Sequence, residues 1–344
     1  MTSGQLAQSR RGPVLPYPEG WFQVSYAQDV APGQVVSLHY FGEELVMFRT
    51  ESGVIQVMDA YCPHLGAHLA RGGRVIGEHL RCPFHAWEYG VDGRCKHIPY
   101  SPTIPPNAKV GIWPTVERAG LVFVWHSSAG NPPYWDLPEF PEYGDPAWEG
   151  YSRHHWIIDT SIQEIAENAV DTGHLPAVHG GTMSEEAKFK VSNGIPPVDI
   201  KFYDHLFDVD LTVNHVSNEA HHTATYYGLG VTISKSTGKG ARCFLTGRTP
   251  IDENQSEVRY SVLTSLNEPE DPTGDIARAY AQFTADEFEK DIEIWNNKIY
   301  RPRPLLCKND GPIDRFRRWA KQFYPAEPGP IKQSDRPTVG SVAR

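Results

Sequence analysis

Two short segments of the chain each combine one cysteine with one histidine. The first is Cys62-Pro63-His64 and the second is Cys82-Pro83-Phe84-His85, with 17 residues between the inner histidine and the second cysteine. Two thiolates and two imidazoles can hold a zinc ion or a [2Fe–2S] cluster. Zinc fingers usually separate their ligands into a cysteine pair and a histidine pair, whereas each segment here is mixed. The pattern therefore favours a cluster with both cysteines on one iron and both histidines on the other.

Ligation by two cysteines and two histidines is that of a Rieske centre, and the surrounding sequence supports this interpretation. Four unrelated core residues would not explain why both segments also carry proline and why the second continues into Trp87. Residues 61–100, YCPHLGAHLARGGRVIGEHLRCPFHAWEYGVDGRCKHIPY, resemble the Rieske non-haem iron oxygenases. Within them the resemblance is to the steroid and sterol branch, the 3-ketosteroid 9α-hydroxylase oxygenase components and the cholesterol 7-desaturases.

The resemblance also separates this chain from the respiratory Rieske proteins. Those proteins carry two further cysteines that join the cluster loops by a disulfide. The corresponding positions here are Ala67 and Phe84. This difference favours the oxygenase or ferredoxin class.

Composition restricts the class of protein further. The 344 residues are 40% hydrophobic and 22% charged, which is typical of a soluble globular protein with room for two domains. A formal net charge of −10 argues against binding to nucleic acid or to an anionic membrane surface. The remaining cysteines, Cys95, Cys243 and Cys307, are an odd set that suits a reducing compartment. With a polar N-terminus and no long apolar segment, we expect a cytoplasmic protein without a membrane span.

The pattern of short alternating segments predicts an α+β protein of two domains. Residues 1–20 are expected to form an N-terminal arm, 21–130 an all-β Rieske domain, 131–325 a catalytic domain and 326–344 a loose tail. The Pro-rich segment at 130–141 marks the domain boundary. Strands are predicted at Val35–Tyr40, Glu44–Arg49, Val54–Asp59, Leu121–Trp125, Phe207–Val213, Thr223–Ile233, Ala241–Thr249 and Glu257–Leu266.

A second segment with chemical potential is SIQEIAENAVDTGHLPAVHG, residues 161–180. Ser161 and Glu164 fit a capping box, so a helix is predicted to begin there. On this helix Asn168, Asp171 and His174 would share one flank, because they are spaced three apart. His174 and His179 are five apart, so a kink at Pro176 is needed to bring both imidazoles to one ion.

By itself this Asp-x-x-His-x-x-x-x-His spacing is a weak metal signal, but it resembles the iron-binding motif of the same oxygenases. The resemblance implies that His174 and His179 are iron ligands. It also implies that Asp171 is a carboxylate between the two metal centres. Asp171 and Asn168 are the candidate catalytic residues of this segment.

Two histidines leave one carboxylate to be found for the 2-His-1-carboxylate set that holds non-haem Fe(II). A long amphipathic helix is predicted from Asp275 to Tyr300. Most acidic residues on it are expected to be solvated, but Asp291 lies beside the apolar stripe. The segment KDIEIWNNK, residues 290–298, resembles the one that carries the third ligand in the steroid oxygenases, at the aspartate. We therefore select Asp291, with Glu287 as the second choice.

The resemblance implies a catalytic domain built as an antiparallel sheet flanked by helices, of the helix-grip type, around an apolar funnel. Candidate pocket residues are Tyr226, Tyr227, Leu229, Val231, Ile233 and Phe244, although for any single one of them a place in the ordinary core is the preferred interpretation. The pairs His154-His155 and His221-His222 could bind metal, but no second pair accompanies them at ligand spacing. For these four histidines packing is the preferred interpretation.

These features together predict the terminal oxygenase component of a multicomponent monooxygenase. It would use O2 and two external electrons to oxidise a C–H bond of a sterol or steroid, with a [2Fe–2S] cluster and a mononuclear Fe(II) as cofactors. The chain has no Gly-rich dinucleotide fingerprint. A separate NAD(P)H-dependent reductase, with or without a ferredoxin, is therefore expected, and the resemblance implies a homotrimer.

Other functions remain open at this level. The substrate could be another hydrophobic polycyclic or aromatic compound. The chain could also be an electron-transfer Rieske protein, although such a protein would end near residue 120, or a sterol-binding module without turnover. The sequence does not distinguish hydroxylation, desaturation and demethylation, nor does it indicate the carbon that reacts.

Overall fold

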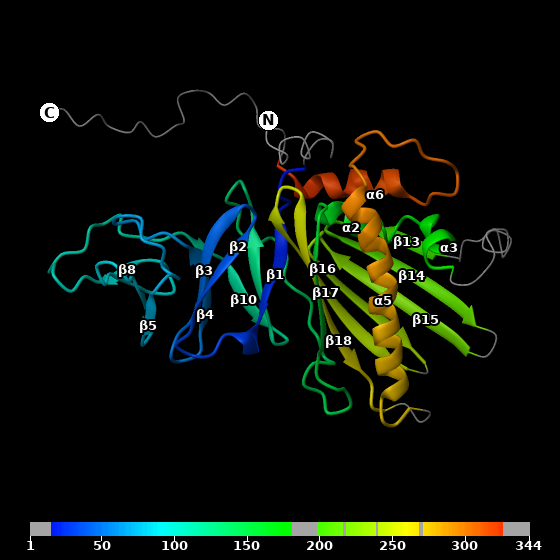
Figure 1. Cartoon of the computed structure of the whole chain (residues 1–344), viewed down its shortest axis with the longest axis horizontal. Helices are drawn as coiled ribbons and strands as arrows, with labels where there is room; N and C mark the ends of the chain where they lie inside the picture. Colours follow the sequence, from blue (N-terminus) through cyan, green and yellow to red (C-terminus); the bar gives the residue numbers. More distant parts are fainter. Residues whose placement is uncertain (1–14, 181–197, 216–217, 239, 268–270, 326–344) are drawn as a thin grey trace.

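The first part of the chain folds entirely into short strands. The computed structural model describes residues 15–180, 198–215, 218–238, 240–267 and 271–325, so the predicted tail and most of the predicted arm lie outside the described residues (Figure 1). The strands are β1 Gly20–Tyr26, β2 Val35–Tyr40, β3 Glu43–Arg49, β4 Ile55–Asp59, β5 Arg74–Ile76, β6 His79–Arg81, β7 Glu88–Tyr89, β8 Cys95–His97, β9 Ile112–Trp113, β10 Thr115–Arg118 and β11 Leu121–His126, with a 3-10 helix η1 at Ala27–Asp29.

These strands form three small antiparallel sheets in the orders β1-β11-β10, β2-β3-β4-β9 and β5-β6-β7-β8. The β5–β8 sheet and its loops lie at one end of the long axis of the molecule (Figure 1). The first part of the chain is therefore all-β, as predicted.

The second part of the chain is built on one seven-stranded antiparallel sheet in the order β12-β18-β17-β16-β15-β14-β13. Its strands are β12 Ser152–Ile158, β13 Val198–Phe202, β14 Leu206–His215, β15 Asn218–Tyr227, β16 Val231–Thr237, β17 Arg242–Asp252 and β18 Gln255–Thr264. The helices are α2 Ile162–Glu167, α3 His174–Val178, α5 Asp275–Asn297, α6 Ile313–Ala320 and the 3-10 helix η3 Lys321–Phe323. The long helix α5 crosses one face of this sheet (Figure 1).

One predicted strand is in fact a hairpin. Thr223–Ile233 was expected to be continuous, but β15 ends at Tyr227 and β16 begins at Val231. Gly228 between them has a φ of +57°, a left-handed conformation that glycine adopts at little cost. The run of apolar residues on both sides hides the turn from a pattern-based prediction.

The two sheet regions share one hydrophobic core. Strand β1 packs directly on the back of β16 and β17, and glycines make this close approach possible. A Cβ at Gly230 would lie 2.2 Å from the Trp21 carbonyl, and one at Gly247 would lie 2.4 Å from Gln23 Oε1. Phe22 of β1 and Phe207 of β14 belong to the same buried cluster. The all-β domain is thereby fixed to the face of the sheet opposite α5.

Within the described residues, no helix combines the length and the apolar character that a membrane crossing requires.

Candidate metal centres

The loops that carry the two Cys/His segments repeat the same backbone turn. The Cys62 carbonyl accepts from Gly66 N–H at 2.9 Å, and the Cys82 carbonyl accepts from Ala86 N–H at 3.2 Å. Gly66 and Ala86 both have left-handed φ angles, +74° and +57°. A left-handed alanine is uncommon, so the second loop keeps this geometry despite its side chain. The repeat presents the two halves of the donor set in equivalent ways.

The donor residues of these loops lie close together, and the two cysteines among them are buried. Cys62 and Cys82 are each 3% exposed. The rings of His64 and His85 lie 4.5 Å apart, and His64 stacks on Trp87 at 4.5 Å with an angle of 9°. The Nδ1 atom of His64 is buried and has no hydrogen-bond partner within the described residues. Buried polar atoms are rarely left unpaired, and a cluster iron bound at this atom would satisfy it.

The donor geometry also bears on the choice between zinc and a cluster. A single zinc ion needs about four donors around one point. Within the described ranges, the only group of three or more such residues placed to hold one ion is His174, His179 and Asp291. The four loop residues do not gather in this way. Their arrangement fits two irons with two protein ligands each.

A tyrosine from strand β7 completes the surroundings of the cysteines. Tyr89 Oη lies 3.0 Å from Cys62 Sγ and donates to it when the sulfur is a thiolate. Burial raises the pKa of the Cys62 thiol, and the Tyr89 hydrogen bond acts against this rise. Because a coordinating thiol is deprotonated outright by its metal, Tyr89 is placed to stabilise a metal-bound sulfur. Nothing in the sequence marked this residue.

The sequence predicted that the second segment forms one helix with a kink at Pro176. The structure has two separate helices instead. Helix α2 ends at Glu167, residues 168–173 form turns, and α3 begins at His174. Pro176 is the third residue of α3, where no intrahelical N–H bond is required. The break therefore precedes the proline. Asn168, Asp171 and His174 do not share the flank of one helix.

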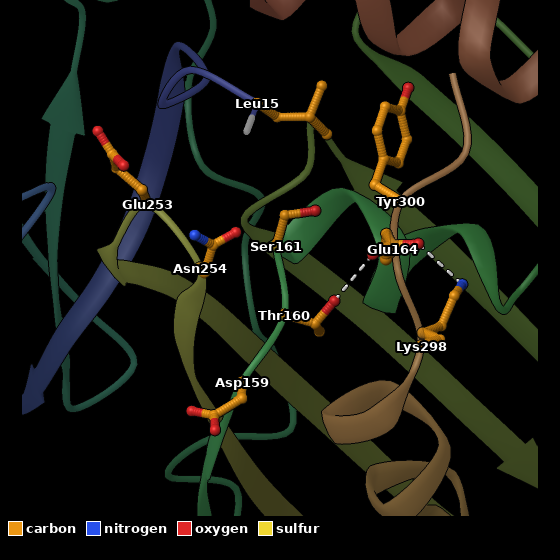
Figure 2. A pocket seen from close by; sticks show the side chains of 9 residues that line it. All are labelled: Leu15, Asp159, Thr160, Ser161, Glu164, Glu253, Asn254, Lys298 and Tyr300. Atoms are coloured by element: carbon orange, nitrogen blue, oxygen red, sulfur yellow. Dashed lines mark hydrogen bonds and ion pairs between the residues drawn. The ribbon is translucent and has the colours of Figure 1, made fainter. Parts of the chain in front are cut away.

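The capping box predicted at the start of α2 does not form. Ser161 is the N-cap but makes no side-chain capping bond. Glu164 instead accepts from Thr160 Oγ1 at 3.0 Å and lies 2.9 Å from Lys298 Nζ (Figure 2). Lys298 directly follows α5, so this ion pair fixes α2 relative to the end of α5. Asn168 directly follows α2, and Asp291 lies on α5.

Helices α3 and α5 bring three candidate ligands to one place. The donor atoms of His174, His179 and Asp291 lie within 4.8 Å of one another. His179 Nε2 is 3.4 Å from Asp291 Oδ2, and the two imidazole rings lie 5.2 Å apart at 80°. Asp291 is 5% exposed although it is an acidic residue on a surface helix. Two imidazoles and one carboxylate form a donor set of the kind that holds non-haem Fe(II).

The remaining nitrogens of both histidines are held by neighbouring groups, which leaves Nε2 of each ring for an ion. His179 Nδ1 lies 2.9 Å from Glu287 Oε2. His174 Nδ1 donates to the main-chain carbonyl of Asp171, not to its carboxylate. The Asp171 carboxylate, which was predicted to lie between the two metal centres, therefore does not orient His174, and its oxygens are left for another donor. Glu287, the second choice as ligand, orients a histidine instead.

Asn168 lies against the donor set. Its Nδ2 donates to Asp291 Oδ2 at 3.0 Å and is 3.1 Å from His174 Nε2. With an ion on His174 Nε2, the contact with Asp291 would remain and would orient that carboxylate. Ligand-orienting contacts of this kind tune a bound metal.

Other candidates from the sequence lie elsewhere. His154 stacks on Trp156, His155 contacts Glu257, His221 lies 2.7 Å from Asp210 and His222 lies 2.8 Å from Ser236. Within the part of the chain that the structure describes, none of these four histidines belongs to a group that could hold an ion. None of the five cysteines forms a disulfide.

Comparison with known protein families shows the family to which the chain belongs. A model of the Rieske [2Fe–2S] domain matches residues 20–112, and a model of the 3-ketosteroid 9α-hydroxylase C-terminal domain matches residues 124–324. The chain belongs to the steroid-hydroxylase branch of the Rieske oxygenases. It is an oxidoreductase, and its cofactors are those of this class, a Rieske [2Fe–2S] cluster and a mononuclear iron.

Curated relatives of this Rieske oxygenase cover most of its length. The chain is 36% identical over 327 residues to a probable 3-ketosteroid-9-alpha-monooxygenase oxygenase component of Rhodococcus rhodochrous, a match that covers 90% of this chain and 80% of the relative. It is 32% identical over 359 residues to the cholesterol 7-desaturase of Xenopus laevis, with 94% and 76% covered.

Solved structures of low sequence identity share the fold. Dicamba monooxygenase bound to dicamba superposes with a TM-score of 0.69 at 19% identity, and the match covers 88% of this chain and 96% of the other. NdmB of Pseudomonas putida CBB5 gives a TM-score of 0.72 at 19% identity, with 90% and 93% covered.

Proposed function

We propose that this Rieske oxygenase is the terminal component of a multicomponent monooxygenase that oxidises a C–H bond of a sterol or steroid with O2 and two external electrons. A separate NAD(P)H-dependent reductase would supply the electrons. The observation that carries the proposal is the convergence of His174, His179 and Asp291 behind a complete Rieske donor set. Relatives named as a 3-ketosteroid monooxygenase component and a cholesterol desaturase support the substrate class.

In this proposal the two donor sets have separate roles. Cys62, Cys82, His64 and His85 hold the cluster, and His174, His179 and Asp291 hold the iron. When bound, the cluster supplies single electrons and the iron provides the centre at which O2 reacts. The protein's own contribution is orientation. Glu287 fixes the ring of His179, the Asp171 carbonyl fixes that of His174, and Asn168 fixes the carboxylate of Asp291.

Electron transfer between subunits of a homotrimer is part of the proposal. In one chain the cluster loops and α3 lie at opposite ends of the long axis (Figure 1), and electrons do not cross such a separation readily. The cluster loops also expose large apolar side chains, among them Leu65, Phe84 and Tyr100, with 61–64% of each accessible. Exposed apolar patches of this kind commonly mark protein interaction sites. A neighbouring subunit that covers the loops would bring its iron near this cluster.

The surroundings of the iron ligands suit an apolar substrate. On the sheet face below α5, Tyr260 packs against Phe288 at 4.9 Å and Phe244 packs with Val262 and Ala281. Leu229 and Val231, in contrast, are at most 1% exposed and belong to the core, as does Tyr226, which stacks on Phe207. Phe244 is also buried, at 2% exposed, and we retain it among the residues that the sequence offered as pocket walls because it packs against Ala281 of α5, the helix that carries Asp291.

The experiment that tests this function is product analysis. Purified protein with both metal centres would be incubated with a panel of 3-keto steroids and sterols, a surrogate reductase, NADH and O2, and the products identified by mass spectrometry. The expected result is a product changed by one oxygen atom or by loss of two hydrogens. The product mass also separates hydroxylation from desaturation, and loss of carbon indicates demethylation.

The control is the Asp291→Ala variant. It should lose the mononuclear iron and all product while keeping the visible and EPR spectra of the cluster, because the two donor sets share no residue. Turnover of aromatic or other polycyclic compounds with no oxidation of any steroid would contradict the proposed substrate class. Retention of the mononuclear iron in the Asp291→Ala variant would contradict the ligand assignment and make Glu287 the next candidate.

A further inference from the structure

A buried ion pair joins helix α6 to the end of α2. Arg317 of α6 donates to Glu167, the last residue of α2, through two parallel hydrogen bonds, from Nε to Oε2 at 2.6 Å and from Nη2 to Oε1 at 2.8 Å. Glu167 is 7% exposed. The Arg317 guanidinium also lies 5.0 Å from the centroid of the Tyr300 ring, and its Nη1 donates to the Arg301 carbonyl at 2.5 Å. Arg317 therefore contacts both the end of α2 and the segment that follows α5.

Glu167 is also the residue from which the turn at residues 168–173 starts. Its carbonyl accepts from the Asp171 N–H at 3.1 Å, which closes the turn between α2 and α3. The first residue of the turn, Asn168, is the one whose amide donates to Asp291 Oδ2 at 3.0 Å. The direction in which Asn168 leaves α2 therefore depends on how Glu167 is held.

Helix α6 meets the same turn at a second point. Gly311, two residues before α6, has a φ of +86°, and a Cβ on it would lie 2.0 Å from the Val170 carbonyl oxygen. A residue with a side chain would not fit here, so glycine allows the start of α6 to lie this close to the turn. Ile313 and Phe316 of α6 belong to the same buried apolar cluster as Val170. The ion pair therefore lies beside an apolar contact between α6 and the turn.

Burial limits what this ion pair can add to stability. The cost of removing two charges from water is similar to the energy of their attraction, and apolar residues of similar volume in place of such a pair often leave stability unchanged or raise it. What two parallel hydrogen bonds add is a fixed direction, because they set the plane of the carboxylate as well as its distance. The geometry therefore favours a role in orientation.

We propose that the Arg317–Glu167 pair positions the mononuclear iron site, an inference that rests on the ligand assignment of the proposed function. Arg317 fixes Glu167, and Glu167 fixes the direction in which Asn168 leaves α2. Asn168 in turn orients the carboxylate of Asp291. Among the described residues, neither Arg317 nor Glu167 has a hydrogen bond or ion pair with a candidate iron ligand. Both act through Asn168, so their effect should appear in the affinity and the ligand geometry of the iron.

The test replaces both charges together, because removal of one would leave the other buried and unpaired. The Fe(II) affinity of the Glu167→Met/Arg317→Met double variant would be measured anaerobically by competition with a chelator, with the visible spectrum of the cluster as a reference. Iron binding should weaken roughly tenfold or more. The cluster content should be unchanged, and the melting temperature of protein without mononuclear iron should equal or exceed that of wild type.

A second readout reports the geometry of the iron ligands. The EPR spectrum of the nitric oxide complex of the ferrous site would be recorded at saturating iron for wild-type protein and the double variant. A positioning role predicts that the spectrum changes, because the Asp291 carboxylate is no longer held in one orientation. A role in folding alone predicts the wild-type spectrum once the site is filled.

Two single variants of α6 serve as matched controls. Arg317→Lys keeps the positive charge but lacks the planar fork of the guanidinium, so it should also weaken iron binding. Arg318 lies on the same helix, where it pairs with Asp314 at 2.7 Å and both side chains are exposed. Arg318→Met should therefore bind iron as tightly as wild type.

The outcomes separate positioning from structure. Wild-type iron affinity in the double variant or in Arg317→Lys would overturn the inference. If the double variant both melts at a lower temperature and binds iron less tightly, the nitric oxide spectrum decides: a changed spectrum supports positioning, and an unchanged one makes the pair structural. Mononuclear iron that is retained in Asp291→Ala would instead refute the ligand assignment of the proposed function, which the variants of Arg317 and Glu167 do not test.

Discussion

The Nδ1 atom of His179 lies 2.9 Å from Oε2 of Glu287, which is one helical turn before Asp291 on α5. The same helix therefore supplies a candidate iron ligand and the carboxylate that orients another. Metal-bound histidines usually donate their second N–H to such a group, and its loss typically lowers metal affinity 10- to 100-fold. The Glu287 side chain also contacts Lys290 Nζ at 2.5 Å, which helps to hold it in place.

Glu287→Gln is therefore expected to weaken mononuclear iron binding by roughly 10- to 100-fold without affecting the cluster. The measurement is Fe(II) competition with a chelator under anaerobic conditions, with the visible spectrum of the cluster as an internal reference. Glu289→Gln is the matched control, because Glu289 lies on the same helix and, among the described residues, accepts from Trp156 and contacts neither histidine of the iron site. Equal iron retention by Glu287→Gln and wild-type protein would show that the contact does not support the metal.

The hydrogen bond from Tyr89 to Cys62 predicts a change in reduction potential. Hydrogen bonds to the sulfur ligands of a cluster stabilise its more negative, reduced state and so raise the potential. Tyr89→Phe removes a bond of about 1 kcal/mol. Since a tenfold change in a one-electron equilibrium corresponds to about 59 mV, the potential should fall by some tens of millivolts.

Redox titration followed by EPR measures this shift. Tyr100→Phe is a useful control, because Tyr100 Oη accepts from Trp87 Nε1 at 2.8 Å and has no hydrogen bond to a cysteine. A reduction potential that is the same in Tyr89→Phe and wild-type protein would mean that the 3.0 Å contact between Tyr89 and Cys62 does not stabilise the reduced cluster.

A buried carboxylate in the Rieske domain predicts sensitivity to acid. Glu88 accepts from Arg81 Nη2 at 2.7 Å and lies 3.3 Å from His79 Nδ1. Burial alone would raise the pKa of Glu88, but Arg81 and His79 hold it below its ordinary value. A carboxylate whose pKa is lower in the folded state stabilises that state fully above its unfolded pKa of about 4.3. This contribution is lost as the pH falls through the lower folded pKa.

Denaturant unfolding of wild-type and Glu88→Gln protein between pH 7 and pH 3 tests this. The stability difference between the two should shrink toward zero as the pH falls below about 4. A difference that does not depend on pH would assign the effect of the substitution to packing and not to the charge of Glu88.

Much of this architecture could be predicted from the sequence because the ligand residues occur in local motifs. The Cys62/His64 and Cys82/His85 segments can be recognised from their short spacings alone. Errors in the predicted bounds of the surrounding strands therefore do not affect them. Asp291 could be selected because burial of an acidic residue beside an apolar stripe is visible in helical periodicity. The hairpin turn at Gly228, in contrast, was hidden because its neighbours are apolar on both sides.

Contacts between distant residues were beyond the reach of sequence patterns. Whether Tyr226 or Phe244 faces the core depends on strand register, which periodicity alone does not set. The pairing of Glu164 with Lys298 and that of His179 with Glu287 join residues more than 100 positions apart. For this reason the supporting residues were missed or assigned other roles, whereas the predicted ligands could be named.

Asp171 is the residue whose predicted role the structure alters and sharpens. Its main-chain carbonyl, not its carboxylate, accepts from His174 Nδ1. Asp171→Asn should therefore preserve the orientation of His174 and retain both metal centres. What the substitution removes is a negative charge beside the iron site, and charge-assisted hydrogen bonds are roughly twice as strong as neutral ones. In the proposed trimer that charge would hold His85 of the partner subunit and complete the electron path between the centres.

The expected result is a variant with normal metal content that loses most turnover. In single-turnover mixing of pre-reduced protein with O2 and bound substrate, oxidation of the cluster should slow by orders of magnitude. Asp310→Asn is the matched control, because Asp310 also lies near Gly173 but its carboxylate accepts from the Cys307 N–H. Cluster oxidation at the wild-type rate in Asp171→Asn would show that Asp171 acts only through its carbonyl contact with His174. The electron path between subunits would then depend on other residues.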